Sequence, residues 1–182
     1  HPAVAVNWAL YGSSGHRERP DGMVTASYTR RGHLGFVVAQ PSFLRAPGLD
    51  PDRAESYRPM SSHVKSIVQP ALTLRPVTPH HFLYRDGRRA VTETGIAFEG
   101  PWSPEVSVAR LRINHYWSKS LGELERKTSR GYACAGTAPS FVYARAIERC
   151  LNAEVDTAIF PIAARMPGWR LPGRRLPGGG ET

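Results

Sequence analysis

The stretch from Val106 to Gly131 constrains the fold more than any other part of this sequence. Apolar and aromatic side chains recur there at every second position: Ala109, Leu111, Ile113, His115 and Trp117. This period of two predicts a half-buried strand. The residues that follow predict a helix, because Ser120 and Glu123 have the spacing of a capping box and Gly131 stands where a glycine C-cap is expected. The sequence therefore predicts a strand that leads within a few residues into a capped helix.

The start of this predicted helix carries Ser118, Lys119 and Ser120. A helix N-terminus with a lysine and two hydroxyl groups beside it is suited to an anion, and phosphate is the anion most often found there. Two plainer interpretations stay open on the residues alone. Lys119 has the properties of a solvated surface lysine, and His115 shares a face with apolar residues, which is typical of a core histidine.

The N-terminal part of the chain predicts a strand followed by a tight turn. Residues 4–11 alternate in the strand pattern, and Gly12 to His16 form a glycine–serine turn that brings backbone amides and a histidine to the strand end. Residues 23–31 predict a short helix. Residues 32–60 are broken repeatedly by proline and predict a long loop. Asp50-Pro51-Asp52 matches the pattern of a metal-binding DxD motif. Because it lies inside that loop, we expect that it is not a metal site.

Further elements are predicted on both sides of the central stretch. Residues 63–68 read as a short strand closed by Pro70, and residues 79–84 lead into an Asp86-Gly87 turn with a returning strand at residues 90–91, which predicts a hairpin. Residues 137–151 carry an apolar stripe at helical spacing. Residues 167–182 are rich in glycine, proline and arginine and predict a disordered tail after a single domain over residues 1–166.

The net charge of +9 indicates an anionic partner: a nucleotide, a nucleic acid or a membrane surface, the last by peripheral association. Arginine is scattered along the chain and no nucleic-acid recognition motif is present, so no specific nucleic acid is expected. The two cysteines form no metal motif. Since no apolar run has the length of a membrane span and no signal peptide opens the chain, the default expectation is a soluble cytoplasmic protein.

Four motifs occur in a fixed order along residues 4–131: NW…YGSSGH, VKSIVQP, PHHF…DG and NHYWSKS…RG. Together they resemble the glycosyltransferase family 92-like proteins, which are transferases related to family 2. The helix before Asn152 and Asp156 extends the resemblance to about residue 160. The last motif is the most specific of the four, because it fixes about eight positions in one strand–helix unit.

This resemblance implies an α/β fold, with a GT-A-like mixed sheet and flanking helices. It also implies an inverting transferase that moves a sugar from a nucleotide-sugar donor to an acceptor hydroxyl of a carbohydrate or glycan, assisted by Mn²⁺ or Mg²⁺. The family pattern includes an N-terminal nucleotide-binding half that ends in an acidic motif. That half is not among these residues, so the chain is expected to be the C-terminal part of the catalytic domain, with its independent activity in question.

The resemblance also assigns site residues. It implies donor binding by Ser13, Ser14, His16, Lys65, Ser118, Lys119 and Ser120, and metal binding by His115. An acceptor hydroxyl needs a general base, usually a carboxylate. Asp21 and Glu123 are the candidates, with Glu18 and Glu93 also near the motifs and no ground for choosing among them. The alternative function is a non-catalytic basic module that binds nucleic acid or another polyanion.

Overall fold

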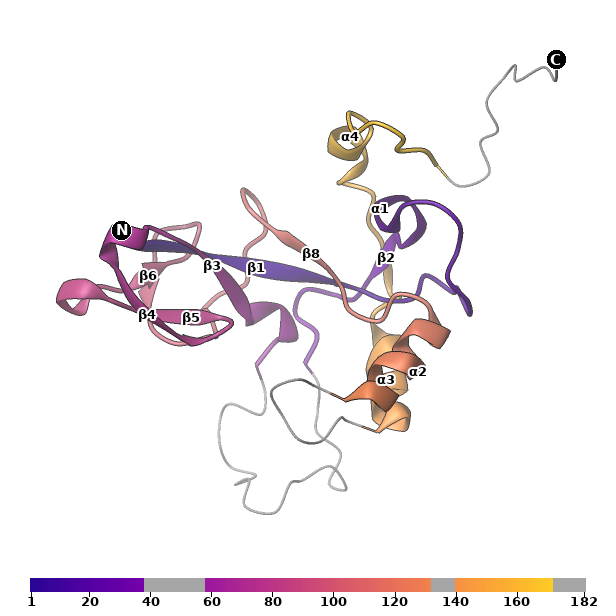
Figure 1. Cartoon of the computed structure of the whole chain (residues 1–182), viewed down its shortest axis with the longest axis horizontal. Coiled ribbons are helices and arrows are strands. Elements are labelled where there is room, and N and C mark those ends of the chain that lie inside the picture. The colour runs from indigo at the N-terminus through magenta and orange to yellow at the C-terminus, as the bar shows by residue number, and fades with distance from the viewer. Residues whose placement is uncertain (38–57, 132–139, 172–182) are drawn as a thin grey trace. The chain divides into compact units, whose positions relative to one another are not determined.

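The computed structural model describes residues 1–37, 58–131 and 140–171. It is a mixed α/β structure with a mixed sheet and few helices, as the α/β prediction required. The chain forms two compact units, His1–Leu10 with His33–His115 (unit 1) and Tyr11–Gly32 with Tyr116–Thr182 (unit 2). The chain passes between the units within β1 (Ala3–Tyr11) and within β8 (Ile113–Tyr116), two strands that pair with each other (Figure 1).

Unit 1 is organised around β1. Strand β3 (Val64–Val68) pairs antiparallel with it over five positions, from Ala3↔Val68 to Asn7↔Val64. The short strand β6 (Ala90–Val91) pairs in parallel with β1, and β7 (Ala97–Phe98) pairs antiparallel with β6. Because β1 has neighbours along its length and is covered on both faces, nearly all its residues are buried and the predicted alternation is not seen in its burial.

The apolar core of unit 1 lies under these strands and comprises Ala3, Ala5, Val64, Tyr84, Ala90 and Phe98, with Val68 and Phe82 packed against it. A separate two-stranded antiparallel sheet joins β4 (Thr73–Thr78) to β5 (His81–Tyr84). The predicted hairpin is therefore wrong, since β5 pairs with β4 and not with β6. The Asp86-Gly87 turn exists within a 3₁₀ helix (Arg85–Gly87), and both residues have positive φ values, 57° and 62°.

Strand β8 is shorter than the alternation predicted. The Glu93 carboxylate accepts hydrogen bonds from the backbone amides of Ala109 at 2.8 Å and Arg110 at 3.0 Å, and from the Ser107 hydroxyl. These amides donate to a side chain and not to a neighbouring strand, so residues before Ile113 are not in the sheet. The same hydrogen bonds outweigh the effect of burial and lower the pKa of Glu93.

In unit 2 the end of β1 continues into a small sheet and four helices. Tyr11 pairs with Arg31 of β2 (Arg30–Arg31), which pairs antiparallel with β9 (Glu154–Val155). The helices are α1 (Val24–Ser27), α2 (Leu121–Arg130), α3 (Phe141–Cys150) and α4 (Phe160–Ala163). Helices α2 and α3 lie side by side and bury Leu124, Ile147 and Leu151 (Figure 1).

The helix boundaries show which local signals were decisive. The capping box of α2 is confirmed, and Gly131 at its C-terminus has a φ of 82°, which glycine adopts readily. Helix α1 covers only part of the predicted 23–31 segment, because Arg30 and Arg31 pair as β2. Helix α3 is capped by Ser140, whose hydroxyl accepts from the Tyr143 amide.

At the C-terminal end, the Trp169 indole donates to the Thr25 hydroxyl at 2.9 Å and its ring lies edge-on to Phe160. Within residues 1–37, 58–131 and 140–171, no helix is long and apolar enough to cross a membrane. Asp50 and Asp52, the interior of the predicted 32–60 loop, and the tail from residue 172 lie outside the described residues.

Candidate functional site

An open groove of about 420 Å³ in unit 2 runs along the start and one face of α2 and is called the α2 groove below. Its lining residues are Tyr116, Trp117, Ser118, Lys119, Glu123, Arg126, Lys127 and Arg130. Four of these side chains are basic and one is acidic, so the described lining carries a net charge of 4 − 1 = +3. Three residues predicted for the site, Ser118, Lys119 and Glu123, line it together.

The turn that joins β8 to α2 places Lys119 in an unusual backbone conformation. Its φ is +52°, a left-handed value that costs free energy for a residue with a side chain. This conformation lets Ser120 take the N-cap position directly after it. The Lys119 ammonium then lies 3.8 Å from Oε1 of Glu123, at the end of the groove.

Glu123 is held by several donors. Its Oε2 accepts from the Ser120 hydroxyl at 2.9 Å, the Ser120 amide at 3.2 Å and the Tyr28 hydroxyl at 2.9 Å. Burial alone would raise the pKa of Glu123, but these hydrogen bonds and the Lys119 charge outweigh it and lower that pKa. A carboxylate that is kept ionised in this way is a weak general base and a good anchor for neighbouring side chains.

Tyr28 completes this arrangement from the segment after α1. The phenol is almost fully buried, and its pKa is raised to about 12, first by burial and then by the Glu123 carboxylate to which it donates. Tyr28 therefore stays protonated at neutral pH and acts as a donor. It donates to Oε2 of Glu123, the same oxygen that accepts from the Ser120 amide, and so helps to fix the orientation of the carboxylate.

The backbone amides at the start of α2 are already engaged. Those of Leu121 and Gly122 donate to the carbonyls of His16 and Arg17, at 3.1 and 2.9 Å. The amide of Glu123 donates to the Ser120 hydroxyl at 3.3 Å. Protein oxygens therefore already accept the hydrogen bonds of the amides that would otherwise bind an anion. Side chains of the α2 groove, and not helix amides, are what this region offers to a ligand.

Ser118 is a buried residue of the groove whose hydroxyl group lacks a partner among the described residues. The residue is only 2% exposed, yet within the described part of the chain its hydroxyl makes no hydrogen bond. A buried hydroxyl without a partner costs about 1–3 kcal/mol, and native structures rarely leave one unused. Since Ser118 lines the groove, an oxygen of a bound ligand would supply the missing partner.

Lys127 contacts Trp117, an aromatic residue that also lines the groove. Its ammonium donates to the Trp117 carbonyl at 2.9 Å and lies 4.8 Å from the centre of the Trp117 ring. Burial lowers the pKa of Lys127, and the charges of Arg130 and Lys119 lower it further. This mutual repulsion among cations would be relieved by an anion in the groove.

Ser13 and Ser14 lie in the predicted glycine–serine turn, where they contact the end of α3. The Ser13 amide donates to Oε1 of Glu148 at 3.2 Å, and the Ser14 amide donates to Oδ1 of Asn152 at 2.7 Å. Glu148 is itself buried and paired with Arg145. The turn amides that were predicted to bind the donor are thus engaged with protein acceptors.

His16 and Asp21 follow that turn. The His16 ring nitrogen Nε2 lies 3.0 Å from the Ser27 carbonyl, and the ring lies edge-on to Tyr28 with centroids 5.5 Å apart. His16 therefore supports the phenol that orients Glu123. Asp21 is exposed in the turn before α1 and is not among the described residues that line the α2 groove.

The remaining predicted residues, Lys65 and His115, belong to unit 1. Lys65 on β3 donates to the Pro79 carbonyl at 2.8 Å. The His115 ring packs 4.3 Å from the Trp8 ring, which also contacts His63 and His80. Among the described residues, no three His, Cys, Asp or Glu side chains are grouped so as to hold a metal ion. A metal at His115 does not fit this part of the chain, and the divalent cation stays a prediction.

Sequence reasoning did not include Arg126, Lys127 and Arg130 in the site. They share one helix face with Glu123, which they follow by three, four and seven residues, and such intervals bring side chains onto the same face of a helix. That spacing was available in the sequence. Three basic residues late in a helix also complement the helix dipole, so the spacing alone does not indicate a site.

Comparisons of the chain with protein-family models, with curated proteins and with solved structures gave no match. The glycosyltransferase resemblance therefore stays a prediction from the four motifs.

Proposed function

We propose that this chain takes part in glycosyl transfer and that the α2 groove holds the diphosphate of a nucleotide-sugar donor. The observation that carries the proposal is the joint presence, in one groove, of four basic side chains and a buried Ser118 hydroxyl without a described partner. The ordered motifs of the sequence support the same function. A GT-A-type architecture belongs to the proposal, and the mixed α/β sheet is compatible with it.

The chemistry explains why cations would be needed there. When the sugar leaves, negative charge grows on the nucleoside diphosphate, and fixed positive groups stabilise that charge. Lys119 lies just before the N-cap of α2, and Arg126 and Arg130 lie one helical turn apart along the helix. Removing one such electrostatic contact typically costs about 10²–10³ in rate. Trp117 and Tyr116 add aromatic surface beside these charges.

Within this proposal, Glu123 is a positioning residue. Its carboxylate lies 3.8 Å from the Lys119 ammonium and is fixed by Ser120 and Tyr28, so it sets where that ammonium points. Asp21, an exposed carboxylate, and Glu18 stay candidates for the general base that receives the acceptor proton.

The alternative, a module that binds a polyanion without catalysis, uses the same positive charge. The two functions differ in what the groove selects. A diphosphate site binds a compact ligand saturably, whereas polyanion binding depends on polymer length and falls steeply with salt.

The full chain should be incubated with UDP- and GDP-sugars and a mixed glycan acceptor, with release of free nucleoside diphosphate as the readout. We expect release that depends on acceptor and falls at least tenfold in Lys119→Gln and Arg126→Gln. Arg149→Gln, an exposed basic residue of α3 that does not line the groove, is the matched control. Saturable diphosphate binding without release would restrict the proposal to donor binding. Tight salt-sensitive binding of oligonucleotides, with no diphosphate binding, would establish the polyanion alternative.

A further inference from the structure

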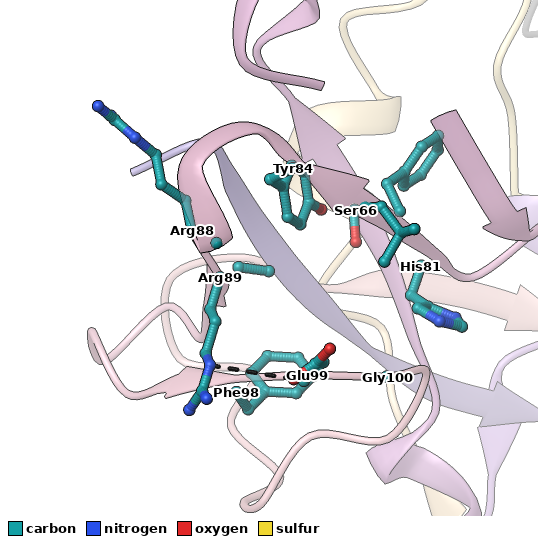
Figure 2. Close-up of a pocket in the computed structure, with 12 residues that line it drawn as sticks. Ser66, His81, Tyr84, Arg88, Arg89, Phe98, Glu99 and Gly100 are labelled. Carbon is teal, nitrogen blue, oxygen red and sulfur yellow. Dashed lines mark ion pairs between the residues drawn. The ribbon is translucent and has the colours of Figure 1, made fainter. Parts of the chain in front are cut away.

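A second cavity lies in unit 1, beside β5 and the turn that leads into β6, and is called the β5 cavity below (Figure 2). Its volume is about 230 Å³. The lining combines hydroxyl, charged and apolar side chains, of which the argument uses Ser66, Tyr84, Arg88, Arg89, Phe98 and Glu99. None of these residues was predicted to form a site, and none belongs to the α2 groove.

Two hydroxyl groups lie at the floor of the β5 cavity, next to apolar side chains of its wall. Tyr84 is only 8% exposed, and Figure 2 shows its hydroxyl directed toward Ser66. The Ser66 hydroxyl otherwise makes one long contact, 3.5 Å to the His80 carbonyl. Phe98 and Phe82 provide the apolar surface next to these hydroxyls. Such a floor offers hydrogen bonds to a ligand that also has an apolar face.

The rim of the cavity carries two arginines with weak partners. Arg89 is paired with Glu99 at 4.0 Å, and Arg88 is paired with Asp86 at 3.8 Å. All four side chains are at least 49% exposed, and exposed ion pairs of this length contribute only about 0–1 kcal/mol. A guanidinium has five N–H donors. Most donors of Arg88 and Arg89 are thus not committed by these ion pairs.

The backbone turn at Asp86-Gly87 determines where Arg88 and Arg89 lie. Asp86 and Gly87 both have left-handed φ values, 57° and 62°, so the chain reverses sharply just before Arg88. Positive φ at both central residues is the type I′ turn pattern that an Asp-Gly pair favours. The turn places Arg88 and Arg89 beside the cavity, and β6 begins directly afterwards at Ala90. Figure 2 shows Arg89 directed toward Glu99 and the Arg88 guanidinium directed away from the other lining residues.

We propose that the β5 cavity binds a single sugar ring that bears a carboxylate or a phosphate. The guanidinium of Arg89 would hold the anionic group, because a planar fork of donors matches both anions. Glu99 and the floor hydroxyls would accept from and donate to the ring hydroxyls, and Phe98 would contact its apolar face. The volume lies below the roughly 300 Å³ at which drug-sized pockets begin, which fits one ring and excludes a whole nucleotide sugar.

The test is a titration of the full chain with three matched probes: glucuronate, glucose 6-phosphate and glucose. Isothermal calorimetry and ligand-observed NMR measure the binding of each probe. We expect at least one of the two anionic sugars to bind at least tenfold more tightly than glucose. Preference for glucuronate would identify a uronic acid as the ligand, and preference for glucose 6-phosphate would identify a sugar phosphate. Arg89→Gln should lose at least tenfold in affinity for the preferred probe.

Arg75→Gln is the matched control, since Arg75 is an exposed arginine on β4 that does not line the cavity. Tyr84→Phe removes only the floor hydroxyl and should weaken binding severalfold. Equal binding of glucose and both anions, or binding unchanged in Arg89→Gln, would overturn the proposal, as would no binding of any probe at millimolar concentration. The α2 groove is tested with UDP and different variants, so failure at one site leaves the other unaffected.

Discussion

The Tyr28 hydroxyl donates a hydrogen bond of 2.9 Å to Oε2 of Glu123 and so joins the segment after α1 to the capping box of α2. The same carboxylate caps the helix and pairs with Lys119. Helix stability and the position of a groove cation therefore depend on one side chain. This relationship leads to the first two predictions.

Replacing Tyr28 with Phe should destabilise unit 2 and raise the pKa of Glu123. The variant removes one hydrogen bond to a charged group, which typically contributes about 1.5–3 kcal/mol. It also removes one of the contacts that lower the Glu123 pKa. Urea unfolding measures the first effect and an NMR titration of the carboxyl measures the second. An unchanged Glu123 pKa would show that Tyr28 does not determine its ionisation.

Ser120→Ala should cost about 1 kcal/mol of unfolding free energy, the usual value for a lost N-cap. Ser140→Ala, which removes the N-cap of α3, is the comparison. Ser140 makes no reciprocal capping box, whereas Ser120 exchanges hydrogen bonds with Glu123 in both directions. Ser120→Ala should therefore be the more damaging of the two by chemical denaturation. The reverse order would contradict the role assigned to the box.

Acid should destabilise unit 1 through His63. The pKa of His63 is lowered from 6.5 to about 4, mainly by burial and then by the charges of His80, Lys65 and His115. Between these two pH values the unfolded chain binds a proton that the folded chain does not, so stability falls as the pH drops from 6.5 toward 4. Below about pH 4, where the folded form is also protonated, this group causes no further loss.

The measurement is the free energy of unfolding of the wild type and His63→Gln between pH 7.5 and 4. The variant should show a shallower decline over this range, because glutamine does not titrate. His80, whose pKa burial also lowers, should account for part of the slope that remains. An identical decline in both proteins would contradict the assignment to His63.

Arg31 should be a stability determinant of unit 2. It pairs with Asp156 at 2.7 Å and with Glu154 at 2.6 Å, and its side chain is only 17% exposed. Arg31→Met should cost about 1–3 kcal/mol, because partly buried carboxylates lose their donor. Asp86→Asn, which removes an exposed pair at 3.8 Å, should change stability by less than about 1 kcal/mol. Thermal melts of both variants give the comparison, and equal shifts would contradict it.

Local signals predicted the elements whose ends are fixed by nearby residues. The α2 capping box is an example, because Ser120 and Glu123 need only each other to form it. The β5–β6 hairpin failed because strand pairing depends on distant segments. Strand β5 pairs with β4, which begins at Thr73, and β6 pairs with β1. Likewise, the strand before Ile113 is shortened by Glu93, which lies sixteen to eighteen residues earlier in the chain.

The predicted site was only partly accessible to sequence reasoning. Ser118, Lys119 and Glu123 line one groove, as a short strand–helix unit allows. The roles of Ser13 and Ser14 depend on Glu148 and Asn152, more than 130 residues away, and nothing local predicts those hydrogen bonds. The β5 cavity is formed by residues from three separate segments of unit 1, and the VKSIVQP and PHHF…DG motifs that supply part of its lining do not show that these segments meet.

The most direct test of the central proposal is a calorimetric titration of the full chain with UDP, GDP and inorganic pyrophosphate at fixed ionic strength. The α2 groove should give saturable binding, reduced at least tenfold in Lys119→Gln and Arg126→Gln but unchanged in Arg149→Gln. Ser118→Ala should weaken binding and, because it removes an unsatisfied buried hydroxyl, leave the melting temperature unchanged or raise it. Absence of diphosphate binding by the folded wild-type chain, or equal loss in all three charge variants, would contradict a diphosphate site in this groove.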